Sequence, residues 1–183
     1  MRPIFKSTAL NKTFQEKGFV SFPLLDRDEV KALKDLYAQL ALPDELGHGY
    51  IVGMNSTFFD RRKAMQEALM ALVREKVEGV MVNRELYTAT FMTKLSSDQN
   101  YVPPHQDWTY TENEEEDPSF MCWITLDDVE KANGALGFIP GSHAKTDYVR
   151  AFPFPLAPTP VEQYKLQLMD LVEIIEMWAG DIA

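Results

Sequence analysis

The chain has 183 residues, of which 45% are hydrophobic and 25% are charged, and its formal net charge is -10. This length and composition fit one soluble globular domain, and the single cysteine, Cys122, excludes an intrachain disulfide. The acidic balance argues against nucleic acid and anionic membranes as main partners, because both attract basic surfaces, and it leaves small molecules.

The sequence carries no targeting or membrane signal. Residues 1–6 are not followed by a long apolar stretch or a cleavage site, and no apolar run approaches the length of a membrane span. One cysteine is also ordinary for a reducing compartment. The sequence therefore predicts a cytoplasmic protein, and it does not indicate the oligomeric state.

The first elements in chain order are a helix and a strand. Residues 7–17 predict a short helix that Gly18 ends, and residues 19–23 predict a strand that ends at proline.

Two longer helices are expected next. Asp26 and Glu29 have the spacing of a capping box, and apolar residues then recur at helical spacing until Pro43. The second helix is predicted to begin after Asp60, with Gly79 near its end. The residues expected to face the core are Val30, Leu33, Leu36, Tyr37 and Leu40 in the first helix, and Met65, Ala68, Leu69, Leu72 and Val73 in the second.

A glycine-rich segment at residues 47–53 separates these two helices and contains His48. His48 is a candidate substrate contact, and the alternative is a plain loop or surface histidine.

From Val80 onward the apolar period changes to two. Residues 86–93 predict one long strand and residues 119–126 predict another, and both patterns are typical of an antiparallel sheet. Between them, residues 111–117 form an acidic run, which is either a solvated loop or a mobile lid.

The last part of the chain alternates between irregular and regular segments. Residues 151–160 hold four prolines and predict an irregular crossing, residues 161–171 predict a helix, and residues 172–178 predict a strand that leads into Gly180 and Asp181.

Helices followed by a block of short strands predict an α+β protein that is mainly β. We expect a double-sheet jelly roll backed by the N-terminal helices. The sequence contains no internal repeat and no linker to a second domain, so residues 1–183 are expected to form a single domain.

His105 and Asp107 are the candidate metal ligands. In a strand, residues i and i+2 point to the same face about 7 Å apart, so the imidazole and the carboxylate can bind one metal ion. They would supply two of the three ligands of a facial triad. A lone H-x-D pattern is weak evidence by itself, and it gains weight only from its context.

That context is a set of motifs in a fixed order. They are Gly18-Phe19-Val20, His105-Gln106-Asp107, Trp123-Ile124-Thr125-Leu126-Asp127-Asp128, Asn133-Gly134-Ala135-Leu136 and Ile139-Pro140-Gly141-Ser142-His143. With these motifs the sequence resembles the phytanoyl-CoA dioxygenase family of Fe(II)- and 2-oxoglutarate-dependent oxygenases. The resemblance covers nearly the whole chain.

The resemblance implies a double-stranded β-helix that holds Fe(II) through His105 and Asp107. A facial triad leaves three metal positions open, which suits a bidentate 2-oxo acid and dioxygen. The implied activity is oxidative decarboxylation of 2-oxoglutarate coupled to hydroxylation of a small molecule.

By the same resemblance, Gln106 and Trp123 match positions that contact 2-oxoglutarate. In a regular strand Gln106 would face away from the site and would need a bulge to reach it. Trp123 is equally well explained as an ordinary core residue. Lys94 and Thr125 are further candidates to bind a carboxylate of the cosubstrate.

The third iron ligand is not among the matched motifs. In the family, the histidine of P-G-S-H does not bind the metal, so His143 is expected to have a structural, hydrogen-bonding role. A distal histidine, and an arginine for the far carboxylate of 2-oxoglutarate, are expected beyond Ala183. We therefore expect a C-terminally incomplete chain that binds iron weakly and has little or no activity.

Two other functions remain open. One is a non-catalytic jelly-roll protein that binds a small molecule, and the other is a cupin-like metalloenzyme with different chemistry, such as an isomerase or hydrolase. The sequence carries no signature of a particular primary substrate.

Overall fold

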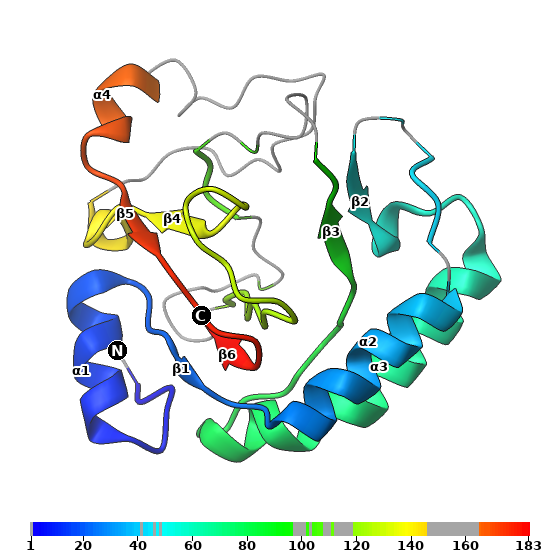
Figure 1. Cartoon of the computed structure of the whole chain (residues 1–183). Helices are drawn as coiled ribbons and strands as arrows, with labels where there is room; N and C mark the ends of the chain where they lie inside the picture. Colours follow the sequence, from blue (N-terminus) through cyan, green and yellow to red (C-terminus); the bar gives the residue numbers. More distant parts are fainter. Residues whose placement is uncertain are drawn as a thin grey trace.

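The computed structural model describes residues 2–40, 42–45, 47, 49–96, 102, 104–107, 111, 119–145 and 165–183. In these residues, long helices and very short strands follow one another as shown in Figure 1. The elements are α1 (Thr8–Lys17), β1 (Phe22–Pro23), α2 (Arg27–Leu40), β2 (Tyr50–Val52), η1 (Gly53–Asn55), α3 (Phe59–Val80), β3 (Met92–Lys94), β4 (Leu136–Phe138), η2 (Ser142–Ala144), α4 (Lys165–Met169), β5 (Glu173–Ile175) and β6 (Asp181–Ile182).

Helix α1 has the ends that the sequence predicts. The Ser7 side chain accepts a hydrogen bond from the Leu10 N–H at 3.3 Å, and Gly18 ends the helix at a φ of 86°. The Gly18 N–H donates to the Phe14 carbonyl at 2.8 Å. The strand predicted at residues 19–23 is shorter than expected, since only β1 pairs with another strand.

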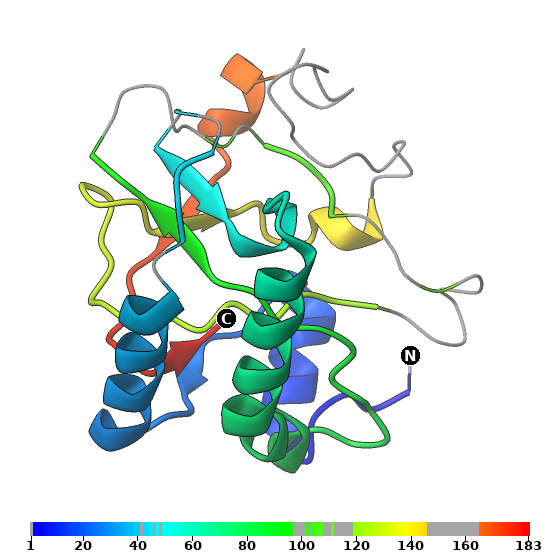
Figure 2. The same ribbon diagram turned by 90° about the vertical axis from the view of Figure 1, so that its right-hand side faces the viewer.

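Helix α2 begins with the predicted capping box. Asp26 Oδ1 accepts hydrogen bonds from the N–H groups of Asp28 and Glu29 at 2.9 Å, and Glu29 Oε2 accepts from the Asp26 N–H at 2.9 Å. Glu29 also forms an ion pair of 2.6 Å with Lys76, and the hydrogen bond from Lys76 lowers the pKa of Glu29. This ion pair links α2 to α3, which lies beside it (Figure 2).

Helix α3 buries most of the predicted face. Met65, Leu69 and Val73 are buried, as predicted, and the row continues to Val77. Leu72 is 43% exposed, so its predicted place in the core is wrong. Steps of four residues rotate the buried face by about 40° each along a helix. The row of buried residues from Met65 to Val77 therefore winds around α3 and turns away from the side on which Leu72 lies.

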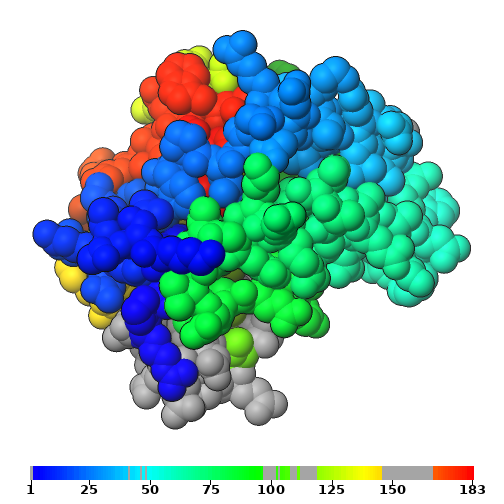
Figure 3. All heavy atoms as spheres, turned by 90° about the horizontal axis from the view of Figure 1, so that it is seen from below, coloured from blue at the N-terminus to red at the C-terminus, as the bar shows by residue number. Residues whose placement is uncertain are grey.

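The two termini of the described chain pack against the helices. The Lys6 N–H donates to the Val80 carbonyl at 3.0 Å, and the Val82 N–H donates to the Ile4 carbonyl at 2.8 Å. Figure 3 shows the N-terminal residues in blue against the end of α3 in green. Ile4 and Ile182 are 2% and 3% exposed, so both ends of the chain contribute to the same core.

The C-terminal strand β6 lies between two neighbours. On one side it pairs antiparallel with β1. On the other side, Trp123 and Ala183 exchange two hydrogen bonds of 2.9 Å, and the Thr125 N–H donates to the Asp181 carbonyl at 3.0 Å. Of the strand predicted at residues 119–126, only residues 123–125 pair with β6 and Ala183. One of its two alternating sets of residues packs against the core, and this set is Phe120, Cys122, Ile124 and Leu126.

The same two chain segments continue to pair beyond β6. Val129 and Met177 exchange hydrogen bonds of 2.8 and 3.0 Å, and then β4 pairs antiparallel with β5. The predicted strand at 172–178 is therefore divided into β5 and this bridge. Of the predicted helix at 161–171, the described part is α4.

The long strand predicted at residues 86–93 is wrong for most of its length. Only β3 is a strand, and it pairs with β2. Before β3, polar groups bond to other parts of the chain: the Leu86 N–H donates to Glu78 Oε1 at 3.0 Å, and Thr90 Oγ1 accepts from the Met54 N–H at 2.9 Å. Tyr87 is 77% exposed. Local partners on α3 and η1 thus replace a neighbouring strand.

Taken together, the described residues show helices and three two-stranded antiparallel sheets, with no closed sheet among them. The α+β class and the antiparallel pairing agree with the prediction, whereas the strands are too short to form the expected jelly roll within the described ranges. His48 and nearly all of the acidic run at 111–117 lie outside those ranges. No described helix has both the length and the apolar character needed to cross a bilayer.

Candidate metal centre

His105 and Asp107 lie in direct contact. His105 Nε2 is 3.1 Å from Asp107 Oδ1, and the two side chains are 23% and 45% exposed. Two ligand atoms bound at right angles to one metal, with bonds of roughly 2.1 Å, lie about 3.0 Å apart. The observed separation therefore fits two neighbouring ligands of one ion, although the pair lies outside the described strands.

The pair provides two ligands of a triad. No group of three His, Cys, Asp or Glu side chains that could hold a metal occurs among the described residues. A third ligand for this pair stays a prediction.

Gln106 lies between the two candidate ligands. Its side chain is half-buried, and its amide oxygen Oε1 is buried. Because residues 104–107 do not form a regular strand, the alternation that would turn Gln106 away from its neighbours does not apply here.

Trp123 and Thr125 occupy the opposite face of their segment from the core residues Cys122 and Ile124. Trp123 is half-buried, whereas Thr125 is only 3% exposed. The Thr125 hydroxyl donates to the Trp178 carbonyl at 2.8 Å. The structure therefore gives the Thr125 hydroxyl a partner within the protein.

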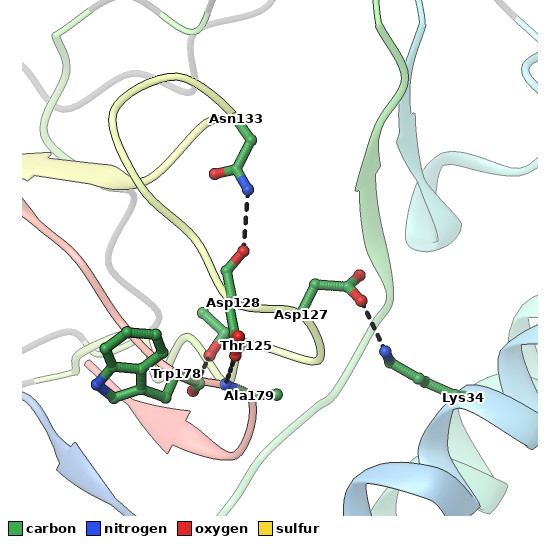
Figure 4. Close-up of polar contacts among 7 residues, drawn as sticks. All are labelled: Lys34, Thr125, Asp127, Asp128, Asn133, Trp178 and Ala179. Carbon is green, nitrogen blue, oxygen red and sulfur yellow. Dashed lines mark hydrogen bonds and ion pairs between the residues drawn. The ribbon is translucent and has the colours of Figure 1, made fainter.

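The motif that contains Thr125 holds the turn before β6, as Figure 4 shows. Asp128 Oδ1 accepts a hydrogen bond from the Ala179 N–H at 2.9 Å, and the Gly180 N–H donates to the Thr125 carbonyl at 2.8 Å. The preceding residue, Asp127, forms an ion pair of 2.6 Å with Lys34 of α2. The side chains of Thr125 and Asp128 thus hold the turn before β6, and the side chain of Asp127 links the motif to α2.

The N-G-A-L motif forms a loop that interrupts the strand pairing. Residues 130–135 lie between the pairings Val129–Met177 and Leu136–Ile175, whereas only Glu176 lies between them on the other strand. Asn133 shapes this loop, because its Oδ1 accepts from the Glu130 N–H at 2.7 Å and its Nδ2 donates to the Asp128 carbonyl at 2.9 Å.

This loop meets Lys94 at the end of β3. Gly134 has a φ of 102°, and a Cβ atom placed on it would lie 3.3 Å from Lys94 Cδ and 3.8 Å from its Nζ. The glycine therefore allows the loop to approach the lysine closely. Although Lys94 is exposed overall, partial burial of its ammonium group lowers its pKa.

Tyr50 is a site candidate that sequence reasoning missed. It pairs directly with Lys94 across β2 and β3, and its hydroxyl contacts Met92 Sδ at 3.6 Å. Burial, and secondly the carboxylate of Asp107, raise the pKa of Tyr50. Only the register of two strands distant in sequence brings Tyr50 beside Lys94, so the sequence alone does not reveal this pair.

His143 lies at the C-terminal end of α1. Its ring occupies the space that a Cβ atom on Gly18 would need, and it lies 6.5 Å from the Phe14 ring. Nearby, the Gly141 N–H donates to the Lys17 carbonyl at 2.8 Å. The P-G-S-H motif therefore packs on the end of α1.

The sequence has also been compared with known proteins. The sequence model of the family described as phytanoyl-CoA dioxygenase matches residues 14–182. No curated protein and no solved structure matches the chain. Because the family match spans far more than half of the sequence, the chain belongs to the phytanoyl-CoA dioxygenase family.

Proposed function

We propose that this protein is an Fe(II)- and 2-oxoglutarate-dependent oxygenase that hydroxylates a small molecule. The observation that carries the proposal is the 3.1 Å separation of His105 Nε2 and Asp107 Oδ1 in a chain of this family. We further propose the family's double-stranded β-helix as the complete fold, with the antiparallel pairs as its described parts.

The roles of the residues follow from their chemistry. His105 and Asp107 would hold the metal with one nitrogen and one carboxylate oxygen, which are two of the three ligands of a facial triad. When bound, iron supplies the oxidative chemistry, while the protein positions ligands and limits water. Trp123 and Gln106 are proposed cosubstrate contacts, and Lys94 is the proposed cationic partner of a carboxylate.

Thr125 is less suited to that last role than Lys94. Its hydroxyl proton is used in the 2.8 Å hydrogen bond to the Trp178 carbonyl. A cosubstrate carboxylate needs a donor, so binding by Thr125 would break a contact that holds the turn before β6.

An anaerobic titration with Fe(II) and 2-oxoglutarate tests the proposal. We expect a weak visible absorption band that needs both additions and, because iron binding is expected to be weak, high Fe(II) concentrations; little succinate should form after oxygen is admitted. H105A and D107A should each remove the band, because each leaves a single ligand of the pair.

The matched control is His143→Ala, since His143 packs against Phe14 and Gly18 at the end of α1. It should keep the parent band. The proposal fails if the parent shows neither a band nor succinate, or if D107A behaves as the parent does. Binding of small carboxylates without metal dependence would instead favour a non-catalytic binding protein.

A further inference from the structure

Arg84, which follows the end of α3, has buried nitrogens that the protein leaves unpaired. Its Nε and Nη2 atoms are both buried, and neither has a hydrogen-bond partner among the described residues. Its third nitrogen, Nη1, donates to the Asn83 carbonyl at 3.1 Å. Because a guanidinium is always charged in a protein, burying it without a partner raises the free energy of the folded state.

The acidic residues close to Arg84 in the sequence pair with a different arginine. Glu78 Oε1 and Glu85 Oε1 each lie 3.5 Å from Arg74 Nη1. Glu78 Oε1 also accepts a hydrogen bond from the Leu86 N–H at 3.0 Å. Arg84 is therefore left without a counter-charge from these two carboxylates.

The backbone directly before Arg84 is also unusual. Asn83 has a φ of 50°, and no other non-glycine residue within the described ranges has a positive φ. This conformation is uncommon for a residue that carries a Cβ atom, and it costs free energy. Two unfavourable features on adjacent residues indicate a functional constraint on this turn.

The two unpaired nitrogens form one edge of the guanidinium. The N–H groups of Nε and Nη2 on this edge are parallel, and they match two oxygens of a carboxylate or a phosphate. Arg84 as a whole is half-buried, whereas Asn83 and Glu85 on either side of it are exposed. The guanidinium therefore lies near the surface, where rotation about the side-chain bonds can present this edge to a small ligand.

We infer that Arg84 binds an oxyanion through Nε and Nη2, and that the oxyanion is a carboxylate or phosphate group of a small molecule. The bound group supplies the counter-charge that Glu78 and Glu85 give to Arg74 instead. The inference concerns a residue that the proposed function does not use, so the two are tested separately.

Thermal melting of the metal-free protein with inorganic phosphate or acetate tests the inference. Each anion replaces chloride at low millimolar concentration and constant ionic strength, so that general effects of salt stay small. We expect at least one of the two anions to raise the melting temperature of the parent in a saturable way, because a ligand of the folded state stabilises it.

Substitutions of Arg84 separate its charge from its geometry. Arg84→Met removes the charge, so it should abolish the shift and raise the melting temperature in chloride alone. Arg84→Lys keeps the charge without the parallel N–H groups, and it should raise the anion concentration for half of the shift at least about tenfold. Arg27→Met is the matched control, because Arg27 is exposed at the start of α2. It should keep the shift of the parent.

The two anions identify the chemistry of the ligand. A shift with phosphate alone assigns a phosphate group, and a shift with acetate alone assigns a carboxylate. The inference is overturned if neither anion shifts the parent, or if Arg84→Met responds as the parent does. It is also overturned if Arg84→Met melts below the parent in chloride, which would show that the guanidinium already has partners inside the protein.

Discussion

At the scale of single residues, Cys122 shows how burial sets reactivity. It packs against the core, and burial raises the pKa of its thiol to about 11. At pH 8 about one thiol in a thousand would be ionised, against roughly a quarter for a free cysteine with a pKa near 8.5. Cys122 should therefore behave as an inert core side chain.

We predict that Cys122 reacts with Ellman's reagent at pH 8 at least about one hundredfold more slowly in the folded protein than in urea. The absorbance of the released thiolate measures both rates. Equal rates in the two solvents would show that the thiol is exposed and ionised as in a free chain.

Gly180 is required by its conformation and its surroundings. Its φ is 99°, and a Cβ atom would collide with the Leu25 carbonyl oxygen. Its own carbonyl accepts hydrogen bonds from Leu24 and Leu25 at 3.0 and 2.9 Å. Gly180→Ala should lower the free energy of unfolding by at least about 2 kcal/mol, because the residue must stay strained or the turn must move.

Gly79 provides the contrast. It lies in α3, and a Cβ atom on it would meet nothing within 4 Å. Gly79→Ala should raise the free energy of unfolding by about 0.5–1 kcal/mol through helix propensity alone. Urea denaturation of both variants measures the difference, and equal effects of the two substitutions would contradict the assigned roles.

At the scale of elements, residues 125–128 are hydrogen-bonded to the turn before β6 and form an ion pair with α2. Thr125 and Asp128 fix the turn at Trp178–Ala179, and Asp127 reaches Lys34 of α2 (Figure 4). These side chains therefore set the position of β6 relative to its neighbour. Their described contacts are structural.

Thr125→Val tests this structural role. The substitution keeps the shape and leaves the Trp178 carbonyl without its donor at a site where Thr125 is 3% exposed. The free energy of unfolding should fall by about 1 kcal/mol, and at most about 3. The affinity for 2-oxoglutarate should stay as in the parent, and a selective loss of that affinity would instead make Thr125 a cosubstrate ligand.

The helices and the site differ in how far the sequence predicts them. Helix α1 and the start of α2 follow from signals within a few residues, such as Ser7, Gly18 and the Asp26–Glu29 box, and the structure has them as predicted. The strand at 86–93 fails because its polar groups bond to α3 and η1, which the alternation of apolar residues cannot reveal.

The same distinction applies to the candidate site. The contact of His105 with Asp107 follows from neighbours in sequence. The pairing of Tyr50 with Lys94, and the approach of Gly134 to Lys94, depend on strand register and on a loop from a distant part of the chain. Such long-range contacts carry no local signal.

At the scale of the whole molecule, the proposed chemistry depends on one centre, the His105–Asp107 pair. Helix α2 packs against one face of β2 and β3 through Tyr37, and Gly134 lies against the Lys94 side chain at the end of β3. His105 and Asp107 give this arrangement its proposed chemistry. The family match makes the centre the expected place of reaction.

Electron paramagnetic resonance of Mn(II), a redox-silent substitute for Fe(II), tests that centre most directly. A titration of the parent, H105A, D107A and the double variant measures bound metal in each. Each single substitution should weaken Mn(II) binding at least about tenfold, and the double variant should be little weaker than the weaker single one, because both side chains serve one ion. Parent-like binding in H105A or D107A would contradict a shared metal.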